Sequence, residues 1–130
     1  RARQPVRAEG ICGLMADGKR NAPINFEAGK LIDHGDDAKT EWRDGVPHRL
    51  DMPPGAAAWV KWYSRDEIAG LQFVCPCGCG AIGYVDVSGD KKPIWSWDGN
   101  AEKPTLSPSI QRTSGCRWHG YLRAGIFEEC

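Results

Sequence analysis

Three cysteines fall within six residues in the segment CPCGCG, at positions 75, 77 and 79. Cysteines two residues apart cannot bridge each other without strain, so disulfides within this triplet are disfavoured. Thiolates at this density favour a metal site, and zinc is the preferred ion. A second segment, CRWHG at 116–120, has the Cys-x-x-His-Gly form of a zinc knuckle. Together the two segments predict a structural zinc site.

The two segments offer five candidate ligands to an ion that takes four: Cys75, Cys77, Cys79, Cys116 and His119. Cys116 and His119 match the knuckle spacing directly, and the triplet competes for the other positions. An iron–sulfur cluster generally takes four cysteines at established spacings, and a zinc deaminase needs a Pro-Cys-x-x-Cys turn. Neither pattern is present. Spacing alone does not identify the spare ligand, and free thiols are also ordinary buried side chains.

The segment IWSWDGNAEKPTLSPSI, at 94–110, separates the two cysteine motifs. It combines alternating tryptophans with turn residues and hydroxyls: Trp95, Trp97, Asp98, Asn100, Thr105 and Ser107. One interpretation is a recognition surface with an aromatic floor and a polar rim. The other is that the tryptophans belong to the core and the polar groups cap loops.

Short apolar runs bounded by glycine, proline or aspartate indicate the strands that must position these groups. The predicted strands are 57–63, 71–75, 81–87, 93–97 and 121–129. SRDE at 64–67 has a serine followed three residues later by glutamate, which predicts one short helix. The sequence therefore predicts a small, mainly antiparallel β domain with a zinc-ribbon-like metal site.

Composition divides the chain near MPPG, at 52–55. Residues 56–130 hold five of the six tryptophans and five of the six cysteines, so they form the predicted zinc-stabilised β domain. Residues 1–55 are poor in apolar runs and are predicted to be an extended arm. Such a segment becomes ordered only when it packs on its own domain or on a partner. Oligomerisation through this arm is one possible use of it.

The charge balance argues against two classes of partner. The 130 residues contain 17 Lys and Arg and 17 Asp and Glu, so no net field attracts nucleic acid or an anionic membrane. No apolar run is long enough to span a bilayer.

Clustered thiols beside a Cys-x-x-His motif favour a reducing cytoplasm. Cys12 and Cys130 are isolated in the sequence and are expected to be simply packed or exposed.

Three stretches carry a resemblance: FVCPCGCG, WSWDGNAEKPTLSPSI and CRWHGYLRAG. In this order they resemble a family of small proteins of unassigned function in tailed bacteriophages and prophages, some named "ammonia monooxygenase". The resemblance implies a phage-encoded protein with zinc on the five candidate ligands, located in the infected host cytoplasm or in the virion. The oxygenase name lacks support, because that chemistry needs copper or iron ligands in a membrane protein.

Two function classes follow from these observations. The favoured one is a zinc-stabilised binding protein without enzymatic activity, which engages a host or phage protein through the aromatic and hydroxyl surface. The alternative is a zinc-dependent hydrolase or transferase with Asp98 or Glu102 as general base. Five candidate ligands argue against the open coordination position that such an enzyme needs. Nucleophilic catalysis by a cysteine beside His119 is a third, weaker alternative. A thiolate that already binds a metal ion is not free to act as a nucleophile.

Overall fold

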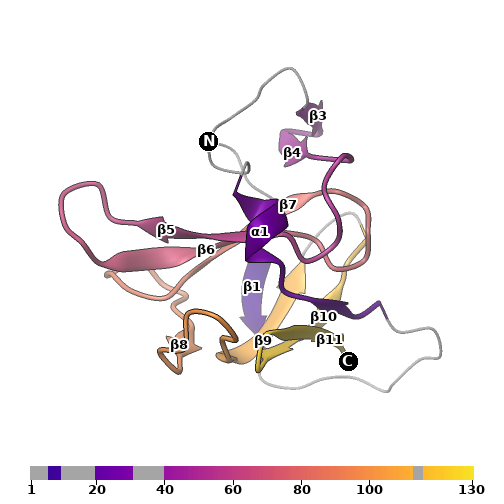
Figure 1. Cartoon of the computed structure of the whole chain (residues 1–130). Coiled ribbons are helices and arrows are strands. Elements are labelled where there is room, and N and C mark those ends of the chain that lie inside the picture. Colours follow the sequence, from indigo (N-terminus) through magenta and orange to yellow (C-terminus); the bar gives the residue numbers. More distant parts are fainter. Residues whose placement is uncertain (1–5, 10–19, 31–39, 113–115) are drawn as a thin grey trace.

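A computed structural model describes residues 6–9, 20–30, 40–112 and 116–130 of the chain (Figure 1). These residues form antiparallel sheets and one short helix, α1 (Phe26–Gly29). Asn25 caps the helix, because its side-chain oxygen accepts a hydrogen bond of 2.9 Å from the Ala28 amide. The prediction of a mainly β, antiparallel fold is confirmed.

The smaller of two main sheets contains β5 (Ala57–Lys61), β6 (Ile68–Val74) and β7 (Ile82–Asp86), paired in that order. All three lie within or close to predicted strands. The helix predicted at 64–67 is wrong, since these residues close the β5–β6 hairpin. The Trp62 amide donates to the Glu67 carbonyl at 2.9 Å, and Lys61 pairs with Asp66 at 2.8 Å. Strand pairing on both sides of the turn outweighs the local capping pattern.

The larger sheet has six strands: β1 (Val6–Glu9), β2 (Ala22–Pro23), β8 (Ser96–Trp97), β9 (Leu106–Arg112), β10 (His119–Arg123) and β11 (Ile126–Glu129). Its order is β1-β9-β10-β11-β2, and β8 also pairs with β9. β9 was not predicted, because its hydroxyls and Pro108 gave it the composition of a loop. The predicted strand 121–129 is a hairpin instead, turned by Ala124 and Gly125 at φ values of 48° and 79°.

The core lies where the two sheets meet. β6 contributes Leu71 and Phe73 to it, and β9 and β10 contribute Ile110 and Leu122, all with no exposed surface. The Phe73 ring lies 5.2 Å from the ring of Phe127 on β11, centroid to centroid. Packing of this kind fixes the positions of β9 and β10, which carry the candidate site.

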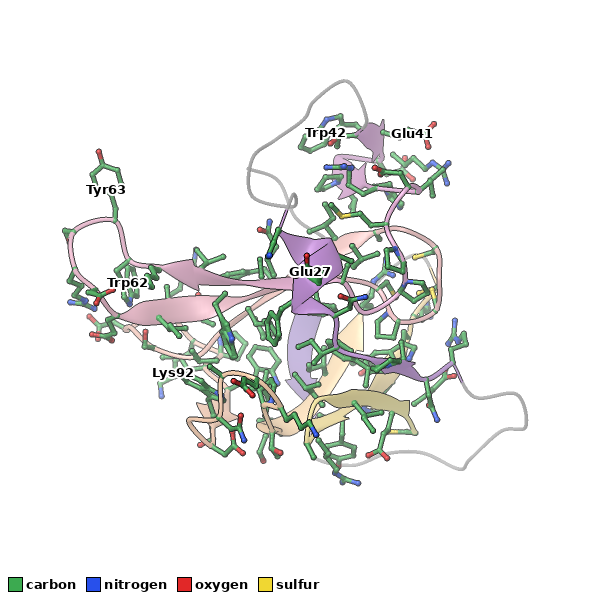
Figure 2. All side chains as sticks on the ribbon, viewed as in Figure 1. Glu27, Glu41, Trp42, Trp62, Tyr63 and Lys92 are labelled. Carbon is green, nitrogen blue, oxygen red and sulfur yellow. The ribbon has the colours of Figure 1, made fainter. Side chains whose placement is uncertain are left out.

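Parts of the segment 1–55 pair with the larger sheet. β1 pairs with β9, and β2 pairs with β11. A separate hairpin, β3 (Glu41–Arg43) and β4 (Val46–His48), follows, with half of the Trp42 side chain exposed. Tyr63 is fully exposed at the tip of the β5–β6 hairpin, which projects from the rest of the molecule (Figure 2).

Candidate functional site

Three of the candidate ligands lie on the tight turn between β6 and β7: Cys75, Cys77 and Cys79. The Cys75 amide donates to the Ala81 carbonyl at 2.8 Å, and the Gly78 amide donates to the Cys75 carbonyl at 3.2 Å. Gly80 has a φ of 84°, and a Cβ there would lie 2.7 Å from a Leu50 methyl group. The turn therefore needs glycine at this position, and its closure points the three sulfurs toward one another.

Cys116, from the connection between β9 and β10, completes a group of four free thiols. The four Sγ atoms all lie within 4.8 Å of one another. Cys75 Sγ is 3.3 Å from Cys77 Sγ and 3.5 Å from Cys116 Sγ, and Cys79 Sγ is 4.0 Å from Cys116 Sγ. A tetrahedral ion with sulfur at about 2.3 Å holds its sulfurs about 3.8 Å apart. The group could therefore hold a metal ion.

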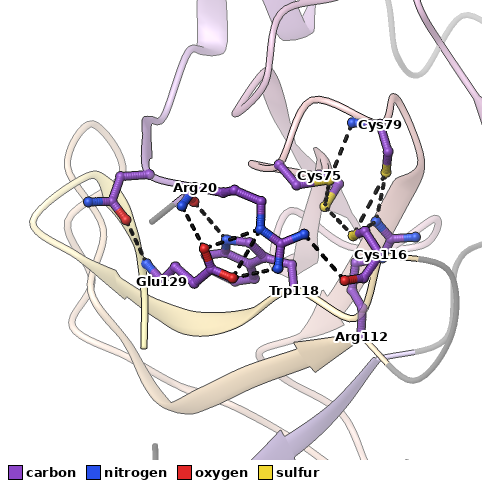
Figure 3. A network of polar contacts seen from close by, with 9 residues as sticks. Arg20, Cys75, Cys79, Arg112, Cys116, Trp118 and Glu129 are labelled. Carbon is purple, nitrogen blue, oxygen red and sulfur yellow. Dashed lines mark hydrogen bonds and ion pairs between the residues drawn. The ribbon is translucent and has the colours of Figure 1, made fainter. Parts of the chain in front are cut away.

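Arg112, the last residue of β9, lies against this thiol group (Figure 3). Its Nη1 donates to Cys79 Sγ and Cys116 Sγ, each at 3.0 Å. The residue is only 1 % exposed, so its charge is almost completely withdrawn from water. A buried guanidinium needs negative partners, and sulfur in its thiolate form supplies them.

The three thiols of the β6–β7 turn differ in their pKa values. Hydrogen bonds from Cys116 and Cys75 lower the pKa of the Cys79 thiol, and Arg112 adds to this effect. Hydrogen bonds with Cys116 and Cys79 raise the pKa of Cys75, and burial raises it further. Burial also raises the pKa of Cys77, to about 11. Of these three, Cys79, beside Arg112, is therefore the thiol that gives up its proton most readily.

His119, the fifth candidate, lies against a serine. Its ring Nε2 is 3.0 Å from Ser109 Oγ. The register of the sheet explains this contact: His119 on β10 is opposite Gln111 on β9, and Ser109 is two residues before Gln111 on the same face. Such diagonal neighbours are within reach of a long side chain. Ser109 is fully buried, and His119 is half-buried.

The surroundings of this pair hold its backbone in place. The His119 carbonyl accepts a hydrogen bond of 2.9 Å from the Cys130 amide, and the Ser109 carbonyl accepts one of 3.3 Å from the Trp95 indole. Gly120 lets the strands approach closely, because a Cβ there would lie 2.2 Å from the Glu128 carbonyl oxygen. A larger residue at 120 would displace His119 from Ser109.

The structure thus brings together four of the five predicted metal ligands and places the fifth in a different contact. The two contacts come from one short segment, in which Cys116 faces the thiols and His119 faces Ser109. Cys130 is disulfide-bonded, in contrast to the expectation that it is merely packed or exposed. Cys12 lies outside the described residues.

The predicted recognition segment divides between core and loop. Trp95 is 2 % exposed and belongs to the core. Trp97 is half-buried, lies 4.5 Å from the Trp59 ring, and donates from its indole to the Asn100 carbonyl at 3.1 Å. The two tryptophans therefore do not form one open aromatic floor.

The polar side chains of this segment bind the backbone of the same region. Asp98 Oδ1 accepts hydrogen bonds from the amides of Asn100 and Thr105, at 3.0 and 3.2 Å. Asn100 Oδ1 accepts from the amides of Glu102 and Lys103, and Thr105 Oγ1 accepts from the Ala124 amide. Ser107 is exposed on β9. These contacts are typical of turn stabilisation.

Sequence reasoning did not single out Ser109 as the partner of His119, although it noted the hydroxyls of this stretch. No short motif marks the serine, because its partner lies ten residues away on the next strand. A Cys-x-x-His segment also favours a metal interpretation of the histidine. The signal that could have found the pair was a serine and a histidine on adjacent strands of a hairpin-like unit, LSPSIQR and HGYLR.

A family model described as "Bacterial ubiquitination-like system serine protease (BubE)" matches residues 42–130. The chain belongs to this family. Neither a curated protein nor a solved structure matches the chain significantly. The BubE match covers both the thiol group and the Ser109–His119 pair.

The BubE match corrects two expectations. The resemblance to a phage family of unassigned function was wrong, and so was the function based on it, a phage-encoded zinc-stabilised binding protein. Cysteine and tryptophan motifs constrain how a chain folds and do not specify its activity, which explains the error. The alternative interpretation as a hydrolase agrees better with a protease family. Among the described residues, no helix combines the length and apolar character needed to cross a membrane.

Proposed function

We propose that the chain is a serine protease in which Ser109 is the nucleophile and His119 is the general base. The observation that carries this proposal is the distance of 3.0 Å between Ser109 Oγ and His119 Nε2. It is the geometry in which a histidine activates a serine hydroxyl. The description of the BubE family as serine proteases supports it independently.

The chemistry follows from this geometry once a local movement opens a path to Ser109, which has no exposed surface in this structure. His119 Nε2 accepts the hydroxyl proton as Ser109 Oγ attacks the carbonyl carbon of the scissile peptide bond. The C–N bond then breaks, the amine leaves with the proton that His119 held, and an ester to Ser109 remains. Water, deprotonated by the same nitrogen, hydrolyses the ester and restores the serine. The substrate class is a protein of a bacterial ubiquitination-like system, as the family description suggests.

We further propose that the thiol group binds zinc in a ribbon-like structural site. Four sulfurs fill a tetrahedral ion, whereas catalytic zinc keeps one position open for water. This argument separates the proposal from a zinc-dependent hydrolase with Asp98 or Glu102 as base. Asp98 Oδ1 already accepts two backbone hydrogen bonds in its own loop. Hydrolysis therefore takes place at Ser109, and the metal has a supporting role.

The test is covalent labelling with a fluorophosphonate, which reacts with activated serines. We expect mass spectrometry to locate one label on Ser109 and expect Ser109→Ala and His119→Gln to abolish it. Ser107→Ala is the matched control, because Ser107 is an exposed serine on the same strand. A label on another residue, or unchanged labelling of His119→Gln, would overturn the assignment.

A further inference from the structure

The thiol group and the serine–histidine pair share one stretch of the larger sheet. Cys116, in the connection before β10, is three residues from His119, the first residue of β10, and Ser109 and Arg112 are three residues apart at the end of β9. Each of these two segments therefore contributes one residue to the serine–histidine pair and one residue to the thiol group or its contacts. A displacement of the thiol group can therefore reach the serine–histidine pair through three residues of backbone.

Direct contacts tie the two strands together at this point. The Arg112 amide donates to the Trp118 carbonyl at 2.9 Å, and the Arg112 side chain reaches the sulfurs of Cys79 and Cys116. On the other side of the segment, Arg20 Nη1 donates to the Cys116 carbonyl at 3.3 Å. The Trp118 indole donates to the Arg20 carbonyl at 2.8 Å (Figure 3). The segment that carries His119 is therefore held from both sides.

The positive charge of Arg112 couples this residue electrostatically to a metal ion bound by the thiol group. A divalent ion bound by four thiolates has a net charge of −2, and the Arg112 guanidinium, 1 % exposed, would neutralise half of it. Without the ion, nothing fixes the separation of Cys79 Sγ and Cys116 Sγ, the two sulfurs to which Arg112 Nη1 donates. Outer hydrogen bonds of this kind orient metal ligands and also respond to them.

We propose that a zinc ion on Cys75, Cys77, Cys79 and Cys116 controls the activity of the Ser109–His119 pair, with Arg112 as the positioning residue that links the two. This inference rests on the proposed function, because it assigns regulation to the same active site. The zinc-bound sulfurs hold Arg112, Arg112 holds the ends of β9 and β10, and these ends set the distance between Ser109 Oγ and His119 Nε2.

The first experiment is a zinc titration of the full chain, measured by peptide hydrolysis and by fluorophosphonate labelling. Metal-depleted protein is kept below its melting temperature and checked for a folded circular dichroism spectrum. We expect hydrolysis to fall at least about tenfold on depletion and to return in proportion to the zinc bound. A folded, metal-depleted protein with full activity would overturn the proposal.

The second experiment compares Arg112→Lys, Arg112→Met and Arg49→Met at full zinc occupancy. Arg49 is a matched control, since it is equally buried but pairs with Asp51 instead of sulfur. For Arg112→Met we expect kcat to fall about tenfold with KM little changed. Arg112→Lys should retain an intermediate kcat because it keeps the charge, and Arg49→Met should be close to wild type. An unchanged kcat in Arg112→Met would contradict the inference, and if this variant does not fold, the zinc titration decides.

A spectroscopic readout distinguishes failure of this inference from failure of the proposed function. Cobalt in place of zinc gives visible absorption bands that depend on its sulfur ligands. We expect Arg112→Met to shift these bands and Arg49→Met to leave them unchanged, whether or not the protein hydrolyses peptides. Zinc-loaded wild type that neither labels nor hydrolyses would refute the protease assignment, whereas unshifted cobalt bands would refute the role of Arg112.

Discussion

At the scale of single residues, the side chains of the segment from Cys116 to His119 point toward different parts of the molecule. Arg117 adopts a left-handed conformation with a φ of 53°, which breaks the alternation of an extended strand. As a result Cys116 reaches the thiols, Trp118 enters the core with no exposed surface, and His119 meets Ser109. One unusual backbone angle therefore directs three nearby side chains to the thiol group, the core and Ser109.

The ion pair between Arg20 and Glu129 gives a prediction about pH. Glu129 accepts hydrogen bonds from the Arg20 amide and side chain, and the side-chain bond holds the pKa of Glu129 below its ordinary value. A lowered folded-state pKa stabilises the fold above the unfolded-state pKa, and this contribution disappears as the pH falls through the folded-state value. Glu129→Gln should therefore lower the free energy of unfolding at pH 7 by about 0.5–1 kcal/mol, given the partial exposure of Arg20.

Urea unfolding at several pH values measures this effect. The difference between wild type and Glu129→Gln should be constant near neutral pH and should shrink as the pH falls below about 4.5, the ordinary pKa of glutamate. Glu128→Gln is the control, because Glu128 is more exposed and is 4.0 Å from its partner, Arg123. A difference that persists unchanged in acid would show that the charge of Glu129 is not the cause.

At the scale of elements, the β10–β11 hairpin places a non-glycine residue in a turn that disfavours it. Ala124 and Gly125 both have positive φ, which is the pattern of a type I′ turn, and asparagine followed by glycine is preferred there. Ala124→Asn should therefore stabilise the protein by about 0.5–1 kcal/mol, since asparagine tolerates the left-handed region. The amide of residue 124 still reaches Thr105 Oγ1.

Thermal melts followed by circular dichroism measure this change, which should appear as a rise in Tm of a few degrees. Gly125→Ala should act in the opposite direction, because its φ is 79° and a Cβ would lie 3.1 Å from Lys103 Cα. Equal melting temperatures for wild type and Ala124→Asn would show that the turn carries no strain at this position.

The sequence predicted some elements well for a clear physical reason. β5, β6 and β7 follow apolar runs, because they contribute to the core, and local composition is sufficient to detect them. β9 alternates apolar residues with hydroxyls and contains Pro108, so its strand character depends on pairing with β1, β8 and β10. Pairing between distant segments leaves no local pattern in the sequence.

Part of the candidate site could likewise be predicted from local sequence, and part could not. Cys75, Cys77 and Cys79 are neighbours in sequence, so their grouping could be predicted from spacing alone. The contact between Ser109 and His119 depends on the register of β9 against β10, which includes an irregularity between Gly120 and Leu122. A shift of one residue would place the two side chains on opposite faces, so spacing could not predict the pair.

At the scale of the whole molecule, the thiol group joins the two main sheets. Cys75 directly follows β6 of the smaller sheet, and Cys116 lies between β9 and β10 of the larger one. A metal ion would therefore cross-link the sheets at one end of the core. Because an ion that binds only the folded chain adds to the free energy of unfolding, a strong chelator should lower Tm by about 10 °C or more.

Differential scanning calorimetry with and without the chelator tests this expectation. Cys77→Ser is the informative variant, since it removes one sulfur of the thiol group at a half-buried position of the turn. It should melt at a lower temperature than wild type and respond less to the chelator. If the chelator leaves the Tm of the wild type unchanged, the thiol group holds no stabilising metal.

The strands β1 and β2 lie at opposite ends of the larger sheet, and both precede residue 42, where the BubE match begins. They cover the open backbone groups of β9 and β11, which would otherwise offer free amides and carbonyls to any extended chain. A fragment that starts at residue 41 would exchange the short edge strands β1 and β2 for the longer strands β9 and β11, and should self-associate by adding strands from other copies. Size-exclusion chromatography with light scattering would detect this as concentration-dependent oligomers that the full chain does not form. By pairing with β9 and β11, the strands β1 and β2 therefore limit self-association of the protein through these two strands.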